Sequence, residues 1–172
     1  MKIFLAFEGT TDLEFLDIFK SWRTKDGKPY DSFNLLSELK KIDKVDDEEL
    51  KASMQQAMSK ADVFAIVIGP KTKSFRKFTR WQVEYAVNSG KPVIAINLNG
   101  IRSVDFDRCP TFLKKNLSMH ITAQNEIFEY ALENWPNSHA EKLAKEDHKN
   151  YRYSNDVYES LGLHTADFAW FN

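Results

Sequence analysis

The residues best suited to chemistry follow an apolar run that ends at Gly69. Lysine and arginine side chains are the usual protein donors to phosphate oxygens. A cluster of these side chains follows the run, and it is compatible with a pyrophosphate site and equally with the solvated start of a helix. Its members are Lys71, Lys73, Arg76 and Lys77.

A second set of polar residues follows the first apolar run, residues 3–7. Glu8 stands directly after this run, and a carboxylate there could accept hydrogen bonds from ribose hydroxyls or from an adenine amine. Thr10 and Asp12 occupy the same stretch. Thr11 and Glu14 have the spacing of a capping box, which predicts that Thr11 caps the next helix.

Several common catalytic and binding motifs are absent from the sequence. It contains no GxGxxG, no GxxxxGK[ST] and no GxSxG. The single cysteine, Cys109, excludes an intrachain disulfide and a multi-cysteine metal site, and the four histidines lack the spacing of metal ligands. We therefore expect no metal and interpret Cys109 as an ordinary thiol.

The elements that must position these residues alternate between strand and helix patterns. Residues 63–68 and 92–98 are continuously apolar, which is typical of strands buried on both faces of a parallel sheet. This pattern predicts an α/β fold whose ligands bind beyond the carboxyl ends of the strands. The other expected strands are 3–7, 30–36 and 119–122, and the expected helices are 11–22, 46–59, 75–88 (ending at Gly90) and 125–135, followed by a helix-prone segment and an apolar end at 168–171.

The segment after the third expected strand carries a recognisable order of motifs. A strand ending in Ile-Gly precedes Arg76-Lys77, and Gly90-Lys91 leads into the next strand. This order resembles TIR domains, and more closely the TIR-like proteins of bacterial anti-phage defence of the Thoeris type. The resemblance covers about residues 1–135. It implies a flavodoxin-like, TIR-like parallel sheet flanked by helices, with residues 136–172 as a short helical extension packed on that domain.

Enzymes of this family cleave the nicotinamide–ribose bond of NAD through a sugar cation that a carboxylate stabilises. The resemblance places the family's catalytic glutamate at Gln82 and its tryptophan at Phe78. Gln82 keeps the shape of glutamate without its charge, and the loss of such a stabiliser costs on the order of 10²–10³ in rate. Glu84 cannot replace it, because helical residues two apart point ~200° away from each other. Gln82 is therefore either an engineered Glu→Gln substitution or a natural feature of an inactive, binding member.

The resemblance also implies a nucleotide pocket around this helix and the ends of the first two strands. Phe78 or Trp81 could stack on nicotinamide or adenine, although core packing explains either residue equally well. NAD is the expected substrate. The implied binding residues are Phe7, Glu8, Asp31, Phe33, Asn34, Lys71, Phe78 and Trp81.

Composition and family together predict the partners. The formal net charge is −1, with 24 Lys plus Arg and 25 Asp plus Glu, so neither nucleic acid nor anionic lipid is an expected partner. No apolar run approaches the ~18 residues of a spanning helix, and the first residues do not have the pattern of a signal peptide. We expect a cytoplasmic protein. Its product would be a cyclic or conjugated ADP-ribose signal read by a downstream effector, with self-association or a phage-derived activator as further expected partners.

Two other functions remain open. Nucleoside deoxyribosyltransferases also place a glutamate eight residues before a Gly-Lys-Pro-Val strand, as Gln82 precedes Gly90 here. A non-catalytic TIR module that acts by self-association or by docking on a partner is the other alternative.

Overall fold

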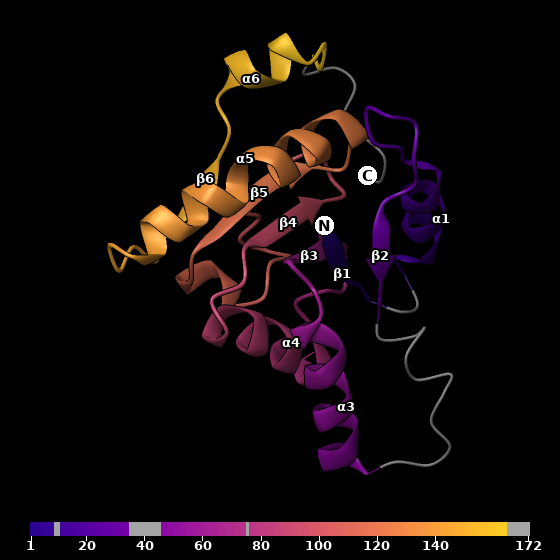
Figure 1. The fold of residues 1–172 in the computed structure, drawn as a ribbon, viewed down its shortest axis with the longest axis vertical. Coiled ribbons are helices and arrows are strands. Elements are labelled where there is room, and N and C mark those ends of the chain that lie inside the picture. The colour runs from indigo at the N-terminus through magenta and orange to yellow at the C-terminus, as the bar shows by residue number, and fades with distance from the viewer. Residues whose placement is uncertain (9–10, 35–45, 75, 165–172) are drawn as a thin grey trace.

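The computed structural model of the chain describes residues 1–8, 11–34, 46–74 and 76–164. A six-stranded sheet has the order β2-β1-β3-β4-β5-β6, and every neighbouring pair is parallel. The first five strands follow the flavodoxin-like order, which confirms the expected α/β class. The strands (Figure 1) are β1 (Lys2–Ala6), β2 (Asp31–Phe33), β3 (Val63–Ile68), β4 (Val93–Asn97), β5 (Ser118–Thr122) and β6 (Asn150–Arg152).

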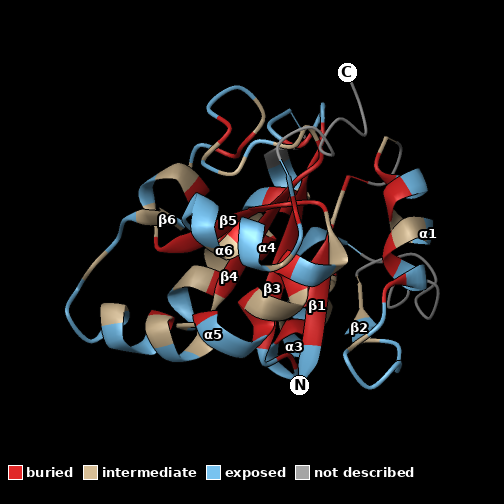
Figure 2. Ribbon diagram, turned by 90° about the horizontal axis from the view of Figure 1, so that it is seen from above, coloured by how far each residue is buried: buried red, intermediate tan, exposed pale blue. Residues whose placement is uncertain are grey.

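Helices cover both faces of the sheet. One buried cluster joins the sheet to α1, α5 and α6, and the other joins its opposite face to α3 and α4. The central strands β3, β4 and β5 are buried along their whole length (Figure 2), as expected for a parallel sheet covered on both sides. The helices are α1 (Leu13–Ser21), α3 (Asp47–Ser59), α4 (Arg76–Asn88), the 3₁₀ turn η1 (Leu113–Lys115), α5 (Asn125–Leu143) and α6 (Asn155–Ser160).

The ends of α4 and α1 can be compared with the helix caps that the sequence predicts. Gly90 has a φ of 66°, and Lys91 N–H donates to the carbonyl of Ala86, which confirms the glycine cap of α4. The capping box predicted for α1 is wrong. Thr11 donates its hydroxyl to Glu8 Oε2, and the N-cap position of α1 belongs to Asp12.

The C-terminal region differs from the expected pattern. Helix α5 continues through Pro136 to Leu143, so the expected division at residue 135 lies inside a helix. After it, β6 adds a strand beside β5 where the sequence predicted only helix. The apolar end at 168–171 lies outside the described residues. Across the described part of the chain, no helix is long and apolar enough to cross a membrane.

Candidate functional site

Two buried carboxylates, those of Glu8 and Asp12, hold the turn after β1. Glu8 N–H donates to Asp12 Oδ2 at 3.1 Å. Glu8 Oε2 accepts from the backbone N–H and the hydroxyl of Thr11, at 2.8 and 2.7 Å. The Asp12 carboxylate also abuts Gly69, where a Cβ would lie 2.0 Å from Oδ1. The carboxyl ends of β1 and β3 therefore meet at this acidic pair.

Asp12 has an unusual acidity for an aspartate. Burial raises its pKa from 3.8 to about 6, while hydrogen bonds from the Glu8 N–H and the Thr11 hydroxyl lower it. A carboxyl group that titrates near neutral pH at the ligand-binding edge of a sheet is typical of functional sites. The sequence placed Asp12 near this edge but gave no reason to prefer it, because its complete burial arises from the fold.

Gln82 lies in the middle of α4 and is 5% exposed. None of the hydrogen bonds among the described residues involves its side-chain amide. It is flanked along the helix by Phe78 and Tyr85, which share its side of α4 because helical positions three and four apart are neighbours. The amide is also not among the completely buried unpaired atoms of the described residues, so it reaches solvent and is available to a ligand.

Of the aromatic residues near Gln82, Trp81 faces α3 and Phe78 packs against Trp81. Phe78 and Trp81 form an edge-to-face pair with ring centroids 5.7 Å apart. Lys77 lies over both rings, and Lys51 of α3 lies 5.5 Å above the Trp81 ring. Trp81 packs against the cluster below α3 and α4, so its packing role is established whether or not it also contacts a ligand.

Glu84 occupies the opposite side of α4. Its Oε1 accepts a hydrogen bond from Arg80 Nε at 2.6 Å, in an i,i+4 ion pair. This position agrees with the helical phase expected from the sequence. It leaves Glu84 engaged with Arg80 and turned away from Gln82.

The remaining predicted binding residues fall into two groups. Lys71 and Asn34 lie at the carboxyl edge of the sheet, after β3 and β2. Phe33 faces the α3 side and forms an edge-to-face pair with Phe4 at 5.5 Å. Two residues lie elsewhere: Phe7 packs on the face that α1 and α5 cover, and Asp31 starts β2 beside Lys2, at the amino edge.

Strand β2 (Asp31–Phe33) falls within the strand expected at residues 30–36, so Asp31 and Phe33 belong to the sheet itself. The register pairs Asp31 with Lys2 and Phe33 with Phe4. Only Asn34 follows the strand at its carboxyl end. Residues 35–36 of the expected strand and Thr10 lie outside the described residues.

The cationic cluster after β3 is divided between different surroundings. Lys77 binds Asp47 of α3, and Lys73 lines a pocket on the other side of α4. Lys71 stays exposed in the turn, where it is available at the carboxyl edge. Cys109 is buried, and burial raises its pKa to about 12, which keeps it a neutral thiol.

Comparison with known proteins agrees with this architecture. A family model described as the Thoeris protein ThsB, TIR-like domain, matches residues 4–103. The matched region runs from β1 past the end of β4 and includes α4 with Gln82. No curated protein matches the chain. With more than half of its sequence matched, the chain belongs to the family of Thoeris ThsB proteins with a TIR-like domain.

Proposed function

We propose that this Thoeris TIR-type protein is built for cleavage of the nicotinamide–ribose bond of NAD at position 82. The supporting observation is the Gln82 side chain, which is 5% exposed and whose amide has no hydrogen-bond partner among the described residues. The amide is not among the completely buried unpaired atoms of the described residues, so it still reaches solvent and can exchange water for the hydroxyls of a bound ribose.

A glutamate at this position would supply what the reaction needs. As the nicotinamide bond breaks, positive charge develops on the ribose, and a nearby carboxylate stabilises it in a site of low dielectric. Gln82 can still hydrogen-bond the ribose hydroxyls, but it carries no charge. The chain with Gln82 should therefore bind NAD and turn it over poorly.

The proposed binding residues follow from their positions. Lys71 would contact the pyrophosphate, and Phe78 would stack on a ring of NAD. Glu8 and Asn34 would lie near the ribose at the carboxyl edge of the sheet. Phe7 and Asp31 are left out of the proposed pocket because one lies on the other face and one at the other edge.

The proposed biological role follows from the family. Cleavage would release nicotinamide and a cyclic or conjugated ADP-ribose signal in the cytoplasm during anti-phage defence. A downstream effector protein would read that signal. Self-association of the chain or a phage-derived activator would control the reaction.

An NAD turnover assay with mass-spectrometric identification of products tests this proposal. The assay compares the unmodified chain with Gln82→Glu and, as a matched neutral control, Gln82→Asn, each with and without lysate from infected cells. We expect Gln82→Glu to release nicotinamide about 10²–10³ times faster than the other two forms. The product mass then distinguishes hydrolysis, cyclisation and conjugation.

The neutral Gln82 also favours a second candidate, a TIR module that binds nucleotide without cleaving it. If Gln82→Glu folds and binds NAD but releases no nicotinamide under any condition, this module becomes the better account. Exchange of a free base with a deoxynucleoside, without NAD cleavage, would instead support the deoxyribosyltransferase alternative.

A further inference from the structure

The chain leaves β4 beside the edge at which we propose the NAD site. Asn97, the last residue of β4, pairs with Ile68 at the end of β3. The next residue of that turn, Gly69, abuts the carboxylate of Asp12 after β1. Residues 99–105, here called the β4 loop, therefore border the same carboxyl edge as the turns after β1 and β3.

The shape of the β4 loop is fixed by side chains of its own and of β4. Asn97 Nδ2 donates to the carbonyls of Ile101 and Ser103, at 2.7 and 2.9 Å. Asn99 Nδ2 donates to Asp105 Oδ2 at 2.8 Å. These bonds hold the turns of the loop, but they do not connect it to an element other than β4. The position of the loop along the edge therefore depends on further contacts.

Arg102 connects the β4 loop to helix α6. Its Nη1 donates to Asn155 Oδ1 at 2.8 Å, and its Cζ lies 4.0 Å from the centroid of the Tyr158 ring. Both partners belong to α6, and Asn155 is 53 positions away from Arg102 in the sequence. A planar guanidinium that stacks on a ring and donates a hydrogen bond is held in one orientation.

Tyr158 attaches α6 to the sheet at the same edge. Its side chain is completely buried, and its hydroxyl accepts a hydrogen bond from the Thr122 N–H at 3.2 Å. Thr122 is the last residue of β5, the strand next to β4. Tyr158 thus joins the carboxyl end of β5 to the Arg102 side chain, and its burial makes it a fixed support for that side chain.

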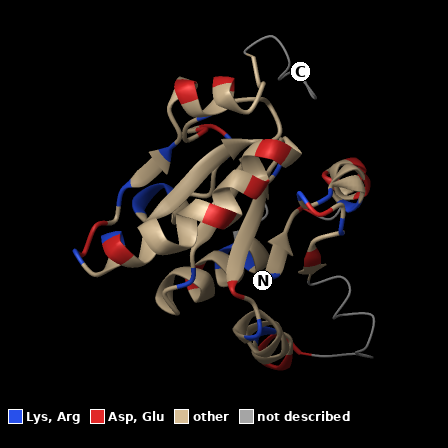
Figure 3. Ribbon diagram, turned by 45° about the horizontal axis from the view of Figure 1, so that its top comes forward, with Lys and Arg blue, Asp and Glu red and all other residues tan. Residues whose placement is uncertain are grey.

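The charge of α6 also favours this contact. The six residues of α6 include Asp156 and Glu159 and no lysine or arginine, and Figure 3 shows the two acids on the helix. Attraction between partly exposed charges is weak and screened by salt. The ring contact and the hydrogen bond to Asn155 therefore set the geometry, and the acidic helix adds to it.

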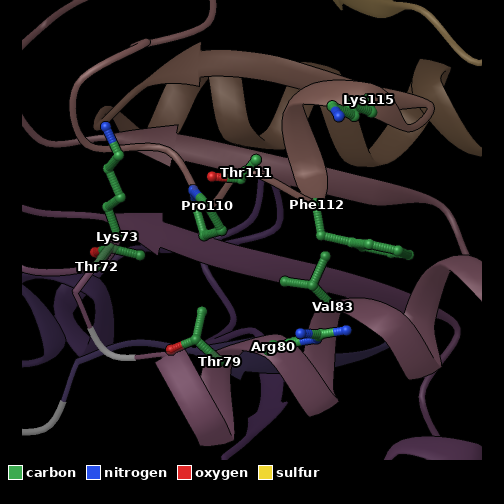
Figure 4. A pocket seen from close by; sticks show the side chains of 9 residues that line it. All are labelled: Thr72, Lys73, Thr79, Arg80, Val83, Pro110, Thr111, Phe112 and Lys115. Atoms are coloured by element: carbon green, nitrogen blue, oxygen red, sulfur yellow. The ribbon is translucent and has the colours of Figure 1, made fainter.

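The rest of the connection between β4 and β5 is held by a different helix. Residues 110–115 face α4 across a pocket of about 560 Å³, into which Pro110, Phe112 and Val83 project (Figure 4). Phe112 packs against the core on this side of the sheet. The cations that border the pocket lie at separate places around it: Lys73, Arg80 and Lys115. The segment 110–115 is thus placed by α4, whereas the β4 loop is placed by α6.

Helix α6 lies outside the part of the chain that the family model matches. The match ends at residue 103, within the β4 loop, and α6 begins at Asn155. Figure 1 shows α6 at the opposite end of the molecule from α3. The Arg102 contacts therefore join the matched region to the C-terminal part of the chain.

We propose that Arg102 is a positioning residue for the NAD site, through which α6 holds the β4 loop at the carboxyl edge. This inference rests on the proposed function and adds a role for the C-terminal part of the chain. A loop that is ordered before the ligand arrives loses less conformational freedom on binding. The contact with α6 therefore raises the affinity for NAD and leaves the chemistry at position 82 unchanged.

Calorimetric titration of the full chain with NAD tests this inference. Arg102→Ala should weaken NAD binding about three- to tenfold, because the ligand must then order the loop. Asn155→Ala should act in the same direction, and Asn155→Asp, which keeps an acceptor oxygen for the guanidinium, should restore the affinity. Arg152→Ala, the matched control, removes an equal charge from an exposed position in β6 and should change the affinity less than about twofold. Equal losses from Arg102→Ala and Arg152→Ala would overturn the proposal.

The pair of Arg102 with Tyr158 distinguishes positioning from general destabilisation. Tyr158→Leu removes the ring beneath the guanidinium, so adding Arg102→Ala to it should weaken NAD binding little further. In a Gln82→Glu background, Arg102→Ala should raise the KM for NAD and leave kcat within about twofold. Additive effects on affinity, or a fall in kcat at unchanged KM, would contradict a positioning role.

Hydrogen exchange of the backbone amides of the β4 loop measures the contact without NAD. Arg102→Ala should speed exchange in the loop while the amides of β3 stay protected, and Arg152→Ala should change neither. Unchanged exchange in the loop would overturn the inference, whatever the NAD assay gives. Equal NAD affinity of the unmodified chain and Arg102→Ala would overturn the inference alone, whereas no NAD binding by the unmodified chain would overturn the proposed function as well.

Discussion

The carboxylate of Asp12 lies so close to Gly69 that a methyl group on Gly69 would be 2.0 Å from Asp12 Oδ1. Contacts below about 3 Å do not occur for real Cβ atoms, so one of the two residues must move if Gly69 gains a side chain. This contact joins the turn after β1 to the turn after β3 at the edge where the ligand site is proposed.

Gly69→Ala should therefore destabilise the protein by about 1–3 kcal/mol, as other overpacked sites do. The penalty should depend on Asp12, because the clash is with its carboxylate. We expect Gly69→Ala to cost at least about 1 kcal/mol less in an Asp12→Ala background, measured by urea unfolding in a double-mutant cycle. The same penalty in both backgrounds would contradict the contact.

Asp12 should make the folded protein more stable as the pH falls. Its pKa is about 6 when folded and 3.8 when unfolded, so the folded state holds its proton more tightly. The free energy of unfolding should rise by up to about 3 kcal/mol on this account as the pH drops from above 6 to below 3.8. Asp12→Asn removes this contribution, which urea unfolding across that range would detect.

His120 should act in the opposite direction. Burial lowers its pKa from 6.5 to about 4, and the charge of Asp105 only partly offsets this. The unfolded chain then binds the proton first, so stability falls by up to about 3 kcal/mol as the pH drops from above 6.5 to below 4. The Asp12 and His120 contributions should nearly cancel in the unmodified protein.

The single variants should show separately how each group changes the free energy of unfolding with pH. Asp12→Asn should lose stability as the pH is lowered from 6.5 to 4, and His120→Gln should gain it over the same range. Parallel unfolding curves for the two variants would show that one of the assigned shifts is wrong.

Glu84 should contribute little to either stability or turnover. An exposed i,i+4 ion pair of this kind is worth about 0.3–0.5 kcal/mol, so Glu84→Gln should cost no more than that. In a Gln82→Glu background, adding Glu84→Gln should leave nicotinamide release within about twofold. A loss comparable to that caused by removing the carboxylate at position 82 would show that Glu84 takes part in the reaction.

The sequence alone determined the central architecture of this protein. Continuous apolar runs predicted β3 and β4, because only strands covered on both faces bury every residue. Gly90 predicted the end of α4, where a left-handed conformation is needed. Helical phase was enough to place Gln82 and Glu84 on opposite sides of that helix, since it depends only on the spacing of residues.

Tertiary structure decided which polar and aromatic residues share an edge or a face. The register of β2 on β1 moved Asp31 to the amino edge beside Lys2, and the alternation of β1 turned Phe7 toward α1 and α5. Burial against Gly69 gave Asp12 its raised pKa. The packing of residues 110–115 opposite α4 formed a basic pocket from segments that lie far apart in the sequence. These properties depend on strand pairing and on the contacts of distant segments, which local sequence patterns do not encode.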